Sequence, residues 1–302
     1  MEVVIAMDWL TQFPEMDRAQ LRDIRKTLDG AYREFSREYG ELIESFFDPL
    51  LSFLIWFEKL LISTPWFIVL AGCSAVVYAA SRSWKLALAC VISLLLIGYF
   101  GMWEDTMRTL SIITVCTLLS IILGIPIGIA MARSNRVQSM IVPLLDVMQT
   151  MPAFVYLIPV VMLLGIGKIP GVIAVVIYAI PPVIRLTNLG IRLVDKEVLE
   201  ASTAFGATAR QRLLGVQLPL AMPTIMAGIN QTIMMALSMV VIASMIGVKG
   251  LGQPVLKSIT NQYFTLGLLN GLAIVVLAIL FDRSSQAYAK RTQAHLRGGH
   301  HD

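Results

Sequence analysis

The sequence predicts an all-α protein that crosses a membrane about seven times. Its composition, its long apolar runs and the uneven placement of its basic residues each point to this fold. The chain has 302 residues, of which 57% are hydrophobic and 15% charged, and its mean hydropathy is +0.74. Soluble domains carry about 25% charged residues, so this composition argues against a soluble enzyme. A net charge of +4 also argues against nucleic acid as a partner.

Seven apolar runs are candidates for membrane spans. A helix rises 1.5 Å per residue and needs about 20 apolar residues to cross a bilayer. The runs cover approximately residues 66–80, 86–102, 109–132, 140–165, 170–188, 220–248 and 264–281. Residues 189–219 form the long polar segment between the fifth and sixth runs. A connection of that length inside a compact body is usually functional or disordered.

Basic residues predict the orientation, because cytoplasmic loops of membrane proteins are enriched in Lys and Arg. Thirteen of them fall on the side of the 189–219 segment and only four between spans on the other side. We therefore expect the N-terminus outside and the C-terminus in the cytoplasm. The expected organisation is a head over residues 1–65, a transmembrane domain over 66–288 with its core at about 105–285, and a cytoplasmic tail over 289–302.

The head is acidic, with twelve of the chain's 20 acidic residues and seven of its 24 basic ones. Apolar residues recur in it at steps of three and four, which predicts an amphipathic helix. They are Leu21, Ile24, Leu28, Tyr32, Phe35, Tyr39, Leu42 and Phe46. Residues 46–63 are apolar but interrupted by charges, which favours a helix lying in the membrane interface. The alternative, an eighth span, would place the head in the cytoplasm.

The segment between the fifth and sixth runs contains a spaced motif. Glu200-Ala201-Ser202 is followed after three residues by Gly206, and after nine more by Val216-Gln217-Leu218-Pro219. The residues predict a short helix that ends at Gly206, because glycine readily takes the positive φ of a helix C-terminus. Pro219 is expected to open the next span. The motif resembles the EAA loop of ABC importer permeases, with Ser202 in place of the second Ala and Val216 in place of Ile.

The resemblance implies that this loop receives the ATPase subunit. The residues that match the family motif, and are therefore expected to couple the ATPase to transport, are Glu200, Ala201, Ser202, Gly206, Leu218 and Pro219. No P-loop is present, since the Gly-Lys pair at residues 167–168 is followed by Ile169. ATP and Mg are accordingly expected on the partner, with no cofactor, metal or catalytic residue on this chain.

Residues 146–167, 178–191 and 217–253 resemble the permease subunits of glycine betaine/proline and choline uptake systems, and the likeness covers about residues 85–290. It implies a type I (MetI-like) importer fold in the bacterial inner membrane. The implied partners are an ABC ATPase, a periplasmic or extracellular substrate-binding protein, a second permease copy and membrane lipid. The implied substrate is a quaternary amine or related osmolyte: glycine betaine, proline betaine, choline, carnitine or trimethylamine N-oxide.

A path through the bundle needs polar groups within the spans. The residues proposed to line it are Asp146, Gln149, Pro152, Tyr156 and Asn230. Asp146 is equally suited to a hydrogen-bonded interface. A stand-alone secondary transporter or channel is the alternative function, but it would need intramembrane ion-coupling residues, and the spans show no paired set of them. A membrane enzyme or receptor would need a His and carboxylate cluster, and all three histidines lie beyond residue 294.

Overall fold

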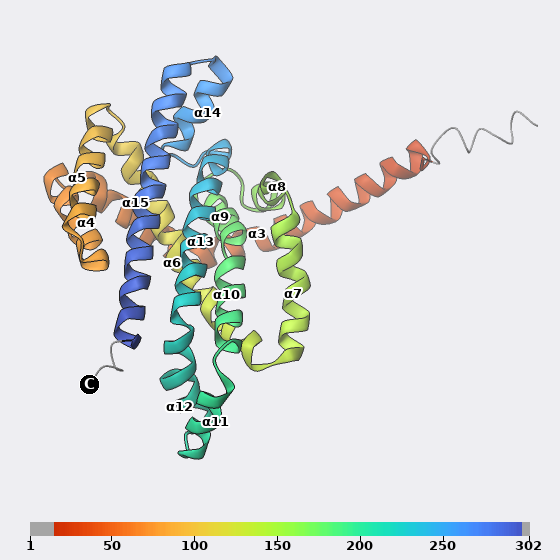
Figure 1. The fold of residues 1–302 in the computed structure, drawn as a ribbon. Helices are drawn as coiled ribbons and strands as arrows, with labels where there is room; N and C mark the ends of the chain where they lie inside the picture. Colours follow the sequence, from red (N-terminus) through yellow and green to blue (C-terminus); the bar gives the residue numbers. More distant parts are fainter. Residues whose placement is uncertain (1–14, 298–302) are drawn as a thin grey trace, which may run out of the picture.

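The computed structural model describes residues 15–297, with side chains to residue 291. Residues 1–14 of the expected head and 298–302 of the expected tail lie outside the described residues. The described chain is helical throughout, without strands. Helices α6 (Trp103–Arg133), α9 (Lys168–Ala179), α10 (Pro181–Arg192), α13 (Leu218–Ala243) and α15 (Phe264–Arg297) form the central bundle (Figure 1). The predicted all-α class is confirmed.

The number of spans differs from the expected seven. Four stretches are long and apolar enough to cross a membrane, or up to six if two bent pairs each count as one span. The four are Trp103–Arg133, Lys168–Arg192, Ala209–Ile246 and Phe264–Arg291. They correspond to the predicted runs at 109–132, 170–188, 220–248 and 264–281.

Local breaks explain the difference. The run predicted over 140–165 is two helices, α7 (Asn135–Thr150) and α8 (Ala153–Leu164), bent by 101° beside Pro152. The runs predicted over 66–80 and 86–102 are α4 (Trp66–Ser81) and α5 (Trp84–Tyr99), of 16 residues each. Sixteen residues reach only about 24 Å, which is short of a hydrocarbon core of about 30 Å. These two helices pack against each other as a hairpin.

The described part of the head is one helix, α3 (Arg18–Ser63), which continues through Pro49. It runs across the bundle, steeply inclined to α13 and α15, and its N-terminal half projects beyond them (Figure 1). Its C-terminal half contributes Leu54, with 1% of its surface exposed, to the main core. Most of the predicted apolar stripe on the N-terminal half is exposed. The placement of this helix relative to the bilayer stays a prediction.

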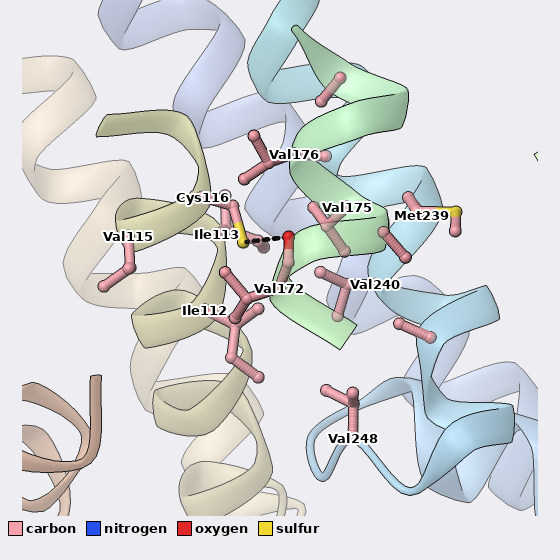
Figure 2. Packing of buried hydrophobic residues seen from close by; sticks show 14 of the residues in the cluster. Ile112, Ile113, Val115, Cys116, Val172, Val175, Val176, Met239, Val240 and Val248 are labelled. Carbon is pink, nitrogen blue, oxygen red and sulfur yellow. Dashed lines mark hydrogen bonds between the residues drawn. The ribbon is translucent and has the colours of Figure 1, made fainter. Parts of the chain in front are cut away.

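The main core lies where α6, α9 and α13 meet. Ile112, Ile113, Val175, Met239 and Val240 fill this region with at most 2% of their surfaces exposed. Figure 2 shows these side chains interdigitating between the three helices, with the Cys116 thiol 3.9 Å from the carbonyl oxygen of Val172. Cys116 is fully buried, and Cys73, Cys90 and Cys116 are all free thiols. A free cysteine in such surroundings packs as a small apolar side chain.

Small residues let α10 approach α6 and α13 closely, as is common between membrane helices. A Cβ on Gly128 of α6 would lie 2.6 Å from Cβ of Thr187 and 2.7 Å from the carbonyl oxygen of Ile184. A Cβ on Gly228 of α13 would lie 3.1 Å from Cα of Val183. This packing fixes α10, which leads directly into the 189–219 segment.

Gly128→Ala is expected to destabilise the protein. The added methyl meets backbone that has no room to move, and overpacking of this kind typically costs about 1–3 kcal/mol. Gly271→Ala on α15 is the matched control, because its Cβ would meet nothing within 4 Å and alanine favours a helix interior over glycine. Thermal unfolding of the detergent-purified chains checks this. Equal midpoints for the two variants would contradict the close approach of α6 and α10.

Candidate coupling site and translocation path

The 189–219 segment forms a lobe at the end of the bundle opposite α14 (Gly252–Asn261) (Figure 1). Its base is fixed by polar contacts from Arg192 at the end of α10. The guanidinium donates to the carbonyl oxygen of Met131 at 2.8 Å and to Oδ1 of Asn188 at 3.0 Å. Apolar packing adds to these contacts, and the cluster comprises Ile191, Leu213, Ala221 and Ile225. Both ends of the lobe are therefore attached to the bundle.

The first element of the lobe is α11 (Lys196–Ala204). It begins at Asp195, whose carboxylate accepts a hydrogen bond from the Glu197 amide at 2.9 Å, a common N-cap arrangement. It ends at Gly206, where φ is +77°. The amide of Gly206 donates to the carbonyl of Thr203 at 2.9 Å, and the amide of Ala207 donates to the carbonyl of Ser202 at 3.1 Å. This pair of bonds is a Schellman motif, and it confirms the predicted helix end at Gly206.

The chain then returns through α12 (Ala209–Arg212), which starts with a capping box between Thr208 and Gln211. The guanidinium of Arg212 donates to the hydroxyl of Thr203 at 3.0 Å and so joins the returning turn to α11. A π-helical turn over Leu213–Gln217 leads into α13, where Pro219 stands at the N-terminus as predicted. The lobe is thus a compact, internally bonded unit.

The structure brings four of the six predicted coupling residues onto α11 and its end. Glu200 and Ala201 are exposed, Ser202 is half-buried and Gly206 is exposed. Leu218 and Pro219 are half-buried at the base of the lobe. A surface hollow of about 450 Å³ lies between the two arms, lined by Leu199, Glu200, Thr203, Ala204, Arg212 and Gln217. The lobe offers a shallow surface rather than an enclosed site.

Sequence reasoning missed Phe205. Its ring is 93% exposed beside Gly206, at the tip of the lobe. An aromatic ring this exposed on an ordered turn is typical of a protein contact surface. The feature of the sequence that could have indicated this exposed ring is its position next to the glycine that ends α11.

Four of the five proposed path residues lie around the bend between α7 and α8. Asp146 on α7 forms an ion pair with Arg185 on α10, with 2.5 Å between the oxygen and the guanidinium nitrogen. Gln149 and Pro152 are exposed near the bend. Tyr156 is 6% exposed, and its hydroxyl donates to the carbonyl of Met148, which ties α8 back to α7. Asp146 was expected either to line the path or to form a hydrogen-bonded interface with a neighbour. The ion pair with Arg185 on α10 agrees with the second expectation.

Asn230 does not join this group. Its amide donates to the carboxylate of Asp282 on α15 at 2.8 Å and accepts a hydrogen bond from Ser285 at 2.5 Å. Its place on the translocation path stays a prediction. An amide in an apolar span turns toward an available polar partner, and these partners lie just beyond the predicted limit of the last span at residue 281.

A buried charge cluster lies at the end of the bundle away from the lobe. Glu58 of α3 is 9% exposed. One carboxylate oxygen lies 2.6 Å from Nζ of Lys168, and the other lies 3.8 Å from Nε of Arg108. Arg108 also pairs with Glu104 and Asp105 on its own helix. Glu58 lies in the segment 46–63 that is expected in the membrane interface, and Arg108 and Lys168 are two of the four basic residues expected between spans on the side of the head.

Comparison with known proteins identifies the family. The model of the family described as "Binding-protein-dependent transport system inner membrane component" matches residues 124–294. The chain belongs to this family. The match includes the whole 189–219 lobe, the three long apolar stretches that follow α6, and the last ten residues of α6.

Relatives of the chain are permease proteins. It is 48% identical over 251 residues to the glycine betaine/proline betaine transport system permease protein ProW of Escherichia coli (strain K12), covering 82% of this chain and 69% of that one. It is 51% identical over 213 residues to the glycine betaine/carnitine transport permease protein GbuB of Listeria monocytogenes, covering 70% and 76%. The chain is thus an inner-membrane transport component and, like these relatives, a permease rather than an enzyme.

A solved structure shows the same fold. A chain of the MetNI methionine ABC transporter, in an inward-facing conformation, superposes with a TM-score of 0.56 at 19% identity. The match covers 61% of this chain and 93% of that chain. The expected type I (MetI-like) importer fold is confirmed for the permease body.

Proposed function

We propose that the chain is the permease subunit of an ATP-driven importer for glycine betaine or a related quaternary amine. The proposed substrate class rests on one observation: the chain is about 50% identical to relatives that are named for glycine betaine transport. The Tyr156 and Tyr178 rings lie 6.1 Å apart at 71°, but the Tyr156 hydroxyl is bonded to Met148. This pair is a structural contact between α8 and α9. The proposal assigns selection among quaternary amines mainly to a separate binding protein.

In this proposal the lobe is the docking surface of an ABC ATPase that carries the ATP and Mg. A second copy of the chain completes the path. Support comes from the compact geometry of the lobe, with Glu200 on its hollow and Phe205 at its tip. Closure of the ATPases would move α11, and the polar and apolar attachment of the lobe to α6, α10 and α13 would transmit that movement to the bundle.

Uptake in proteoliposomes tests the substrate class. The chain is reconstituted with its ATPase and receptor, and uptake of labelled glycine betaine is measured against excess unlabelled competitors. We expect proline betaine, choline or carnitine to compete and methionine to have no effect. Competition by methionine with none from quaternary amines would overturn the substrate assignment and leave the family intact.

We also propose that the N-terminus lies outside and the lobe and C-terminus lie in the cytoplasm. Glu58 of α3 supports this, because it contacts Lys168 at the start of α9 and Arg108 near the start of α6. The other end of α6 contacts the base of the lobe through Met131, and α10 separates α9 from the lobe. The head side of the bundle is thus remote from the lobe.

Cysteine labelling checks this orientation. An impermeant thiol reagent is expected to label Arg25→Cys in intact cells and Arg210→Cys only after permeabilisation, since both positions are exposed. The unsubstituted chain, with its three native cysteines, gives the background. Labelling of both sites only after permeabilisation would place head and lobe on the same side and contradict the proposal.

A further inference from the structure

An apolar groove lies apart from the lobe and from the residues around the α7–α8 bend. Its volume is about 560 Å³, and it runs between the α4–α5 hairpin and α15, with the end of α3 and part of α6 at its floor. Gly72, Cys73 and Val76 line it from α4, Leu94 lines it from α5, and Leu277 and Phe281 line it from α15. Nearly all of its lining is carbon, and the few polar groups include Thr114 and Ser284.

The outer surfaces beside the groove are also apolar. Val76 is 70% exposed on α4, Ile92 is 57% exposed on α5, and Ile279 is 53% exposed on α15. In an inner-membrane protein such surfaces face hydrocarbon. An unfilled groove of this size would forfeit van der Waals contacts along its walls. Lipid chains are as apolar as the lining, so an acyl chain suits the groove without any polar group to satisfy it.

One end of the groove is basic. Ala80 of α4 and Ser284 of α15 line that end, and Nη1 of Arg291 donates to the carbonyl of Ala79 at 3.1 Å. Arg82 and Lys85 stand in and just after the turn that joins α4 to α5 at the same end. None of the ion pairs formed among residues 15–291 includes these three basic residues. The nearby acid on α15, Asp282, is instead bonded to Asn230 and Gln286.

We propose that this groove binds an anionic phospholipid. One acyl chain lies between α4, α5 and α15, and the headgroup phosphate lies over Arg82, Lys85 and Arg291. Basic pockets between membrane helices are known to recruit anionic headgroups. The acyl chain gains little by leaving other lipid for the groove, so the basic end supplies the preference for an anionic lipid over a neutral one.

Photo-crosslinking tests the site in the full chain. The chain is reconstituted in nanodiscs of phosphatidylcholine that contain an equal trace of phosphatidylglycerol or phosphatidylcholine with a diazirine on one acyl chain. Crosslinked residues are mapped by mass spectrometry. We expect labels within residues 68–80 and 277–284, with several times more from phosphatidylglycerol.

Gly72→Leu separates this groove from general contact with lipid. A Cβ at Gly72 would meet nothing within 4 Å, so the new side chain enters the groove without a clash and should remove the labels. Gly271→Leu on α15, whose Cβ also meets nothing within 4 Å and which does not line the groove, should retain them. If Gly72→Leu leaves the labelling unchanged, the acyl-chain site is overturned. The same conclusion follows if a second copy of the chain or a partner covers the groove and prevents labelling.

Charge removal tests the headgroup. Arg82→Gln combined with Lys85→Gln should bring phosphatidylglycerol labelling close to that of phosphatidylcholine, because the attraction of one basic side chain to an anionic surface is already worth roughly fivefold. The control is Arg133→Gln combined with Arg136→Gln, a basic pair expected on the same side of the membrane but not lining the groove. Equal labelling by the two lipids in the unsubstituted chain would overturn the anionic preference.

Discussion

Gly206→Val is expected to abolish coupled transport while the protein remains in the membrane. Gly206 holds a φ of +77°, a conformation that costs a residue with a Cβ about 1–3 kcal/mol and is least accessible to a β-branched one. A cost of 1.4 kcal/mol already lowers a population tenfold. The Schellman bonds from Gly206 and Ala207 would break, and α11 would lose its fixed end. Substrate-stimulated ATP hydrolysis and uptake by the reconstituted complex measure the effect.

Two variants show whether the backbone conformation is responsible. Gly215→Val lies in the same lobe, and neither glycine has any atom within 4 Å of an added Cβ. Gly215 has no positive φ, so this variant should retain most activity. Gly206→Asn should be intermediate, because asparagine tolerates the left-handed region better than other residues with a Cβ. Full coupled transport by Gly206→Val would show that the lobe is not the coupling element.

Glu58→Ala is expected to lower the free energy of unfolding by about 2–4 kcal/mol. It leaves Lys168, and in part Arg108, without a counter-charge in a largely buried position. Breaking a buried pair costs about 3–5 kcal/mol, and the expected loss is somewhat smaller because the Lys168 and Arg108 side chains are 27% and 23% exposed. Thermal unfolding of the detergent-purified chain measures the loss.

Matched variants isolate the ion pair. Lys59→Ala removes an exposed neighbouring charge outside the ion pairs of the described chain and should change stability little. Glu58→Met combined with Lys168→Met should recover most of the loss, because apolar residues often replace a buried pair without cost, while Arg108 keeps Glu104 and Asp105. A Glu58→Ala variant as stable as Lys59→Ala would mean that α3 is not attached through this cluster.

The lobe was largely predictable from sequence because its geometry is local. Asp195 and Gly206 are an N-cap and a C-terminal glycine, whose roles depend on neighbouring backbone groups. The four long apolar stretches were predictable for a similar reason, since the length and composition of an apolar run are enough to indicate a membrane-spanning helix. The spacing of Glu200, Gly206 and Pro219 was specific enough to indicate the family that the comparison later showed.

Long-range partners were not predictable in the same way. Nothing in the sequence pairs Asn230 with Asp282 and Ser285, more than fifty positions away, yet all three are joined by hydrogen bonds. Likewise, nothing in the sequence pairs Glu58 with Lys168, 110 positions away, yet Nζ of Lys168 lies 2.6 Å from the Glu58 carboxylate. The bend at Pro152 was also missed, because the apolar run continues across it and hydropathy carries no information about the angle.

The energy source for accumulation tests the account most directly. Proteoliposomes that contain the chain and its ATPase, with the receptor outside, are loaded with ATP or with a nonhydrolysable analogue, and glycine betaine uptake is followed with and without ionophores that collapse ion gradients. We predict accumulation that requires hydrolysable ATP and persists when the gradients are collapsed. Accumulation that does not depend on ATP and is abolished by the ionophores would identify a secondary transporter and contradict the ATP-driven importer mechanism.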